Sequence, residues 1–99
     1  MNDDQGFAPS PFQPDRALQA LQRDLRALGL SERAGVFERR GTAIAQVAVD
    51  AAVLLAARVS RPSRTSPEWL RSTLADAAQV RHFLAELKKQ LALWSDRDD

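Results

Sequence analysis

The longest apolar run of the chain lies at residues 41–59, which read GTAIAQVAVDAAVLLAARV. Asp50 is its only carboxylate, and no Gly or Pro follows Gly41 within it. Because the run is longer than a typical strand, we expect it to form a helix. Its apolar positions cover much more than one stripe of that helix, and a helix of this kind has to be buried on several sides.

A shorter amphipathic helix is expected over residues 15–29. Pro14 and Asp15 suit the first turn, because Pro lacks the amide hydrogen that would have no partner there and a carboxylate favours the positive end of the helix dipole. Leucines then recur at spacings of three and four residues and make one apolar stripe: Leu18, Leu21, Leu25 and Leu28. Gly29 ends the helix, and Leu30 is placed to fold back on the last turn as in a Schellman cap.

Residues 60–67 read SRPSRTSP and predict a loop, because they combine Pro, Ser and Thr with no aliphatic or aromatic side chain. Ser66 and Pro67 are typical of a helix start. Apolar residues follow at spacings of three and four over about six turns, which predicts a third helix. These residues are Leu70, Leu74, Ala77, Val80, Leu84, Leu87, Leu91 and Trp94.

These elements predict an all-α fold. A long antiparallel helical hairpin pairs residues 31–60 with residues 67–95, and Gly35 and Gly41 mark a weak point in its first helix. The single domain spans 15–95, with a disordered N-terminal tail at 1–14 and a frayed C-terminus at 96–99. The helix at 15–29 can cover only about half of the hairpin, so we expect oligomerisation, most simply a twofold dimer, to complete the bundle.

Composition narrows the function classes. The chain has 99 residues, a net charge of +1 and no cysteine, which excludes disulfides and thiolate metal sites. Its start lacks the basic and apolar pattern of a secretory signal. The run at 41–59 is near the minimum length of a membrane span, but Gln46 and Asp50 lie near its middle, where a charge is costly. We therefore expect a cytoplasmic protein that does not use a membrane as partner.

The residues that usually carry catalysis form no recognisable motif. His82 is the only histidine, and it falls on the polar side of the third predicted helix, one turn before Glu86. A metal site would need more ligands at suitable spacing. Asp50 is interpreted as part of a narrow polar strip with Gln46. No glycine-rich phosphate loop is present, so we expect no enzyme activity, no cofactor and no bound metal.

The sequence therefore predicts a non-enzymatic assembly or adaptor protein that acts through helix–helix packing. Its partner would be a second copy of the chain or another protein subunit. Small residues on the second helix would let a partner helix come close, and apolar residues near the end of the third helix would extend the contact. The predicted interface residues are Gly41, Ala45, Ala48, Ala52, Ala56, Leu84, Leu87, Leu91 and Trp94.

The alternative is a small nucleic-acid-binding subunit or regulator. Residues 31–64 carry six arginines against three acidic residues, on both sides of the predicted hairpin loop. Arginines gathered around that loop would contact phosphates, although no part of the chain is basic enough to indicate nucleic acid by charge alone. The candidate anion contacts are Arg39, Arg40, Arg58, Arg61 and Arg64.

Overall fold

The apolar run at 41–59 forms two strands of a sheet in the computed structural model, which describes residues 12–97. The described chain contains two helices and five strands, so the prediction of an all-α helical hairpin or bundle is wrong. In chain order the elements are α2 (Pro14–Ala27), β1 (Ser31–Arg33), β2 (Val36–Arg39), β3 (Thr42–Asp50), β4 (Val53–Val59), β5 (Trp69–Leu74) and α3 (Ala77–Arg97).

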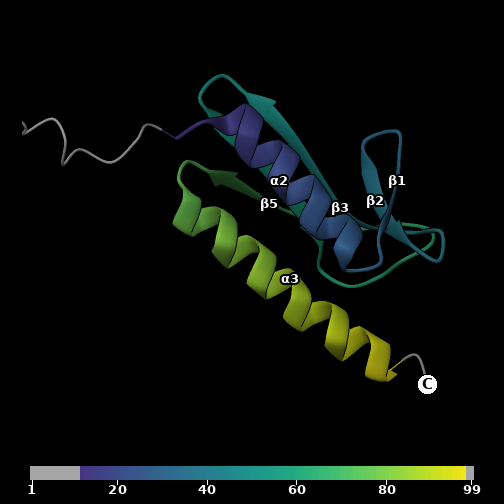
Figure 1. The fold of residues 1–99 in the computed structure, drawn as a ribbon. Helices are drawn as coiled ribbons and strands as arrows, with labels where there is room; N and C mark the ends of the chain where they lie inside the picture. Colours follow the sequence, from purple (N-terminus) through teal and green to yellow (C-terminus); the bar gives the residue numbers. More distant parts are fainter. Residues whose placement is uncertain (1–11, 98–99) are drawn as a thin grey trace, which may run out of the picture.

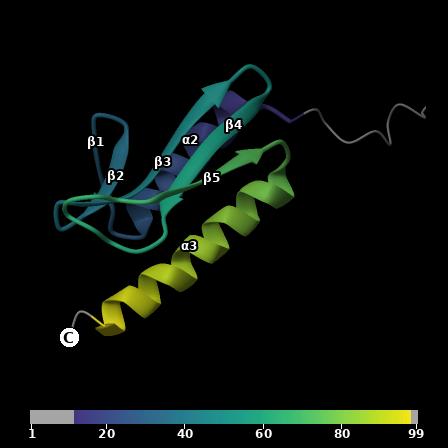
Figure 2. The same cartoon turned by 180° about the vertical axis from the view of Figure 1, so that it is seen from behind.

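The five strands form one antiparallel sheet in the order β1-β2-β3-β4-β5, so each strand pairs with its neighbour in sequence. Both helices pack against the same face of this sheet and against each other (Figures 1 and 2). The molecule therefore has two layers. One sheet face is covered by α2 and α3, and the other, which we call the open face, has no helix on it.

Three two-residue turns connect the first four strands. Ala34 and Gly35 join β1 to β2, and Arg40 and Gly41 join β2 to β3, with all four residues at positive φ between 54° and 83°. Turns with two positive φ angles match the twist of antiparallel strands, and Gly adopts such angles without strain. Gly35 and Gly41 are therefore turn residues, and they are not kinks in a helix.

β-branched side chains explain why 42–59 prefers the sheet. Ile44, Val47, Val49, Val53 and Val59 all lie on β3 or β4, where such residues pack well. The alanines between them favour a helix in isolation. Pairing of β3 with β2 and β4, and of β4 with β5, overrides that local preference, because tertiary packing commonly outweighs intrinsic propensity.

A bulge in β3 places consecutive residues in the core. Phe37 pairs with Ala45 while Glu38 pairs with Ala43, so Ile44 is an extra residue opposite β2. Ile44 and Ala45 are both buried, which strict alternation along a strand would not allow. Phe37 is fully buried beside them.

The core lies between the covered face and the two helices. α2 contributes Leu21 and Leu25, and the chain that follows it contributes Leu30. The remaining buried members of this cluster are Phe37, Ile44, Ala45, Leu54, Ala56, Val59 and Leu74 from the sheet, and Phe83, Leu87, Leu91 and Trp94 from α3.

The first predicted helix is confirmed. It begins at Pro14 with Asp15 in its first turn and buries Leu21 and Leu25. At its end the Leu30 amide donates to the Leu25 carbonyl oxygen (3.3 Å) and the Gly29 amide to the Arg26 carbonyl oxygen (2.9 Å), with Gly29 at φ +92°. These two bonds form the expected Schellman cap.

The third predicted helix is right only in its second part. The predicted start at Ser66 and Pro67 is wrong, because 69–74 is strand β5 and the helix begins at Ala77. Asp76 accepts a bond from the Gln79 amide at Oδ1 (2.8 Å), while Gln79 Oε1 accepts one from the Ala75 amide (2.6 Å). Asp76 is the N-cap residue and Gln79 reaches the amide of the residue before it, so the pair resembles a capping box and sets the start of α3.

The ends of the chain fall partly outside the description. Of the predicted tail at 1–14, residues 1–11 lie outside the described residues, while Phe12 packs against the core. The predicted frayed end covers residues 96–99. Helix α3 continues to Arg97, and residues 98–99 lie outside the described part of the chain. Within the described part, neither α2 nor α3 combines the length and apolar character that a membrane-crossing helix requires.

Ala51 allows a direct test of the turn geometry. It connects β3 to β4 at φ +55°, where an L side chain is strained by about 1 kcal/mol. We expect Ala51→Gly to raise the free energy of unfolding by up to about 1 kcal/mol in urea denaturation. Ala52→Gly is the matched control, because Ala52 is exposed in the same turn without a positive φ, and it should be neutral or destabilising. A loss of stability in Ala51→Gly would contradict this turn conformation.

Candidate functional site

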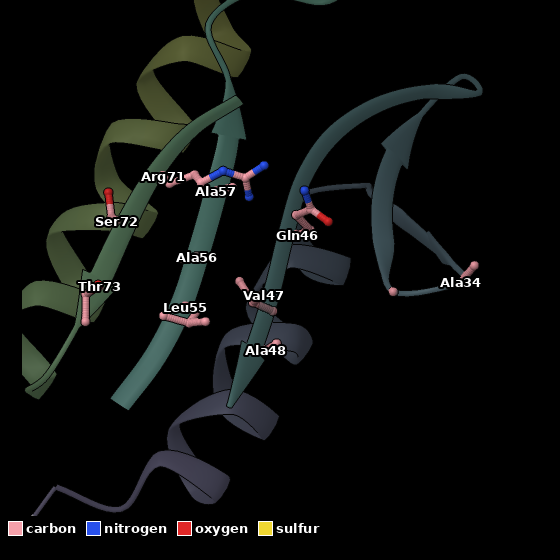
Figure 3. Close-up of a pocket in the computed structure, with 11 residues that line it drawn as sticks. Ala34, Gln46, Val47, Ala48, Leu55, Ala56, Ala57, Arg71, Ser72 and Thr73 are labelled. Atoms are coloured by element: carbon pink, nitrogen blue, oxygen red, sulfur yellow. The ribbon is translucent and has the colours of Figure 1, made fainter. Parts of the chain in front are cut away.

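The open face contains a hollow of about 570 Å³. Side chains of β3, β4 and β5 form its floor, and the turn between β1 and β2 borders one side (Figure 3). Both helices lie behind the strands in this view. The lining residues are Ala34, Gly35, Gln46, Val47, Ala48, Leu55, Ala56, Ala57, Arg71, Ser72 and Thr73.

Strand register sets which side chains reach this hollow. Ala48, Leu55 and Thr73 form one cross-strand row, and Gln46, Ala57 and Arg71 form the next. Residues in one row share a face of the sheet, and Figure 3 shows these side chains on the side away from the helices. Three of these six positions are therefore apolar, and two of the three are alanine.

The solvent exposure of the floor side chains depends on the size of their cross-strand neighbours. Leu55 is 44% exposed, because the residues beside it in its row are only Ala48 and Thr73. Ala57 is 3% exposed, although no helix covers it, because the longer side chains of Gln46 and Arg71 flank it. The exposed apolar surface of the floor is therefore centred on Leu55.

Charged residues surround the floor. Arg71 lies at the β5 side and is exposed, and Asp50 is exposed at the end of β3. Glu38 on β2 forms an ion pair with Arg33 of β1, with Nη2 to Oε2 at 2.8 Å. An apolar centre with charges at its border is the usual composition of a protein interface.

The predicted interface residues do not lie on one surface. The small-residue helix face does not exist, because its members belong to two strands and their turns. Of the nine residues, Ala45, Ala56, Leu87, Leu91 and Trp94 are buried in the core, and Leu84 is half-buried beside it. Gly41 and Ala52 are exposed in turns. Of the nine, Ala48 and the buried Ala56 line the hollow of the open face, and only Ala48 is exposed there.

The predicted arginine cluster is partly assembled. Arg39, Arg40 and Arg64 line a second hollow of about 320 Å³, which we call the arginine hollow, together with Thr42, Ile44, Pro62 and Ser63. Arg58 instead lines a third hollow between β5 and α3. Arg61 is exposed in the loop between β4 and β5 and lines neither of these two hollows.

The third hollow holds the sole histidine. Its volume is about 560 Å³, and its lining includes Arg58, Asp76 and Glu86 beside His82. His82 is exposed on α3, and Asp76 already caps that helix. Among residues 12–97 no cluster of three or more His, Asp or Glu side chains is placed to hold a metal ion.

Sequence reasoning missed most of the open-face residues. Leu55, Arg71 and Thr73 lie in segments that the sequence predicts to be helical, and the predicted anion contacts include neither Thr42 nor Ser63. The sequence feature that could have indicated strands is the pair Gly35 and Gly41. Each follows a residue that can occupy a two-residue turn, and each precedes a β-branched residue. Reading these as hairpin turns would have placed alternate residues of 42–50 on opposite faces.

Comparison with known proteins leaves the function to be argued from this geometry. A scan against protein-family models, a search of curated proteins and a search of solved structures each found no match.

Arg39 connects the arginine hollow to α3, and this predicts an effect on stability. Its Nη1 donates to the Leu91 carbonyl oxygen (3.3 Å) and to Ser95 Oγ (2.7 Å). Arg39→Met keeps the aliphatic stem but removes both bonds, so we expect a loss of about 1–2 kcal/mol in unfolding free energy. Amide exchange at residues 91–95 should become faster. Arg40→Met, in the adjacent exposed turn, is the control, and equal stability of the two variants would contradict this role.

Proposed function

We propose that the protein is a non-enzymatic assembly protein that binds a second copy of itself through the open face of its sheet. The observation that carries the proposal is the apolar, uncovered floor around Leu55. It keeps the predicted self-association but moves it from helices to a sheet. The predicted cytoplasmic location stays a prediction.

The composition of the open face supports a partner. When one face of an antiparallel sheet is in water, the side chains that point to that face are normally polar. Here the floor contains Ala48, Leu55 and Ala57, and Val36 and Val53 are half-buried in the adjoining cross-strand positions. Contiguous apolar surface with a charged border marks protein interaction sites. The small side chains of Ala48 and Ala57 beside Leu55 let a second sheet approach closely.

The charges around the floor favour a second copy over a foreign partner. Asp50 is the cross-strand neighbour of Val53 on the β3 side, and Arg71 is that of Ala57 on the β5 side. Val53 and Ala57 lie two residues before and two residues after Leu55 on β4, so the two charges are diagonally opposite with Leu55 midway.

This diagonal is self-complementary. In a face-to-face dimer the twofold axis lies in the interface plane. An axis through Leu55 and perpendicular to the diagonal sets Asp50 of each copy against Arg71 of the other. The two leucines then meet at the axis, between two symmetric ion pairs, as an isologous interface requires. Opposite charges at such positions set orientation more than affinity.

Leu55→Glu tests the apolar centre. Size exclusion with light scattering over a range of concentrations should show a dimer for the unchanged chain. In Leu55→Glu the dimer dissociation constant should rise by about tenfold or more, which is roughly 1.4 kcal/mol. Leu93→Glu is a closely matched control, because Leu93 is 45% exposed on α3. A monomer at all concentrations, or equal weakening by both variants, would contradict the proposal.

Charge reversal tests the diagonal separately. Asp50→Arg alone and Arg71→Asp alone each replace two attractive contacts with two repulsive ones, so each should weaken the dimer several-fold at low salt. The double variant exchanges the charges and should recover most of the affinity. A double variant weaker than either single one would exclude this twofold arrangement, even if Leu55 remains at the interface.

A further inference from the structure

We infer that the arginine hollow, formed by Arg39, Arg40, Thr42, Ile44, Pro62, Ser63 and Arg64, is a binding site for the phosphate group of a small molecule. The site lies on different residues from the open face and does not depend on self-association. Its ligand class is a tetrahedral oxyanion with two negative charges.

The charge of the hollow has one sign. Three guanidinium groups line it and no carboxylate does. Near Arg39 and Arg40 in sequence, Glu38 pairs with Arg33 at 2.8 Å and Glu32 pairs with Arg26 at 2.9 Å. Near Arg64, Glu68 accepts a hydrogen bond from Ser60 Oγ (3.0 Å) and does not line the hollow. Cations gathered in a concave surface focus their field and attract an anion that relieves their mutual repulsion.

Two elements far apart in sequence form the hollow. The β2–β3 turn supplies Arg40, and the β4–β5 loop supplies Ser63 and Arg64. That loop is closed at its base by bonds from the Ser60 amide to the Glu68 carbonyl oxygen (2.9 Å) and from Ser60 Oγ to Glu68 Oε1 (3.0 Å). The loop and the turn lie at the same end of the sheet (Figures 1 and 2).

The donors suit a phosphate group. Arg40 and Arg64 are exposed, and neither guanidinium group makes an ion pair or hydrogen bond with any residue in 12–97. Ser63 Oγ accepts bonds from the Ser66 amide (3.0 Å) and the Thr65 amide (3.4 Å). These bonds orient its hydroxyl and leave its proton to be donated. Planar guanidinium groups bind phosphate oxygens in pairs.

Arg39 contributes a fixed charge at the wall of the hollow. Its bonds to the Leu91 carbonyl oxygen and to Ser95 Oγ hold its side chain toward α3. Thr42 is its cross-strand partner and is half-buried. A side chain that is already held in place loses little conformational freedom when a ligand binds, which favours affinity.

The arrangement favours a small ligand over a nucleic acid strand. Single-strand binding uses a basic groove that follows the backbone, with aromatic rings on which bases stack. No aromatic residue lines the arginine hollow, and its apolar contacts are Ile44 and Pro62. Arg58 lies in a different hollow with Asp76 and Glu86, so the five predicted arginines do not form one track.

A titration of the isotope-labelled full chain with inorganic phosphate, and separately with pyrophosphate, tests this site by NMR. Ionic strength is held constant with chloride. We expect saturable shifts of the amides at 40–42 and 63–64. Shifts that do not saturate, or that spread evenly over the surface, would overturn the proposal.

Two matched double variants decide whether phosphate binding depends on the hollow itself or only on the net charge of the protein. Arg40→Gln with Arg64→Gln should weaken phosphate binding by about tenfold or more, with an unchanged melting temperature. Arg16→Gln with Arg81→Gln removes the same two charges from exposed helix positions and should have little effect. Equal weakening by both pairs would show only a net-charge effect and would overturn the site.

A parallel titration with an oligonucleotide distinguishes a small phosphate ligand from a nucleic acid strand. A twelve-nucleotide single strand of DNA or RNA, at the same salt concentration, should perturb the same amides no more strongly than pyrophosphate does. A strand that binds more tightly, shifts residues well beyond the hollow and shows a steep salt dependence would replace this proposal with a nucleic-acid interface.

Discussion

Burial of one sheet face beneath two helices is the constraint on which the rest of the structure depends. Phe37, Leu54 and Leu87 are each completely buried where the two layers meet, and they come from β2, β4 and α3. A five-stranded sheet of short strands has too little apolar area to be stable alone. The helices supply the second layer, and the capped ends of α2 and α3 set where each helix begins or ends against the sheet.

The same constraint leaves the other face uncovered. The described chain has two helices, and both are used on one side, so alternate residues of β3, β4 and β5 face outward without a second layer. In a sheet with one wet face these positions would be polar. The apolar side chains of Leu55, Ala48 and Ala57 at these positions are the basis of the proposed self-association, in which the diagonal of Asp50 and Arg71 would set the orientation of the second copy.

The arginine hollow is a consequence of topology. In a meander of antiparallel strands, the β2–β3 turn and the β4–β5 loop emerge at the same end of the sheet. This brings Arg40 close to Arg64 across more than twenty residues of chain. Neither residue is in a recognisable motif, and the distance between them in sequence carries no signal. Their convergence is visible only once the pairing of β3 with β4 is known.

The amino-acid sequence by itself determined the parts of the fold that depend on neighbouring residues. Local spacing and capping determine the start of α2 at Pro14, its leucine stripe and its Schellman cap at Gly29 and Leu30. They also determine the loop after Val59 and the apolar stripe of α3 beyond Val80.

The structure of the central run at 41–59 was decided by tertiary structure, because Ala favours a helix locally while β-branched residues favour a sheet. Only pairing with β2 and β5 and burial beneath α2 resolve that conflict. Which face of β3 and β4 is covered, and therefore which residues form the candidate sites, depends on strand register, and register is set by contacts between segments that are distant in sequence.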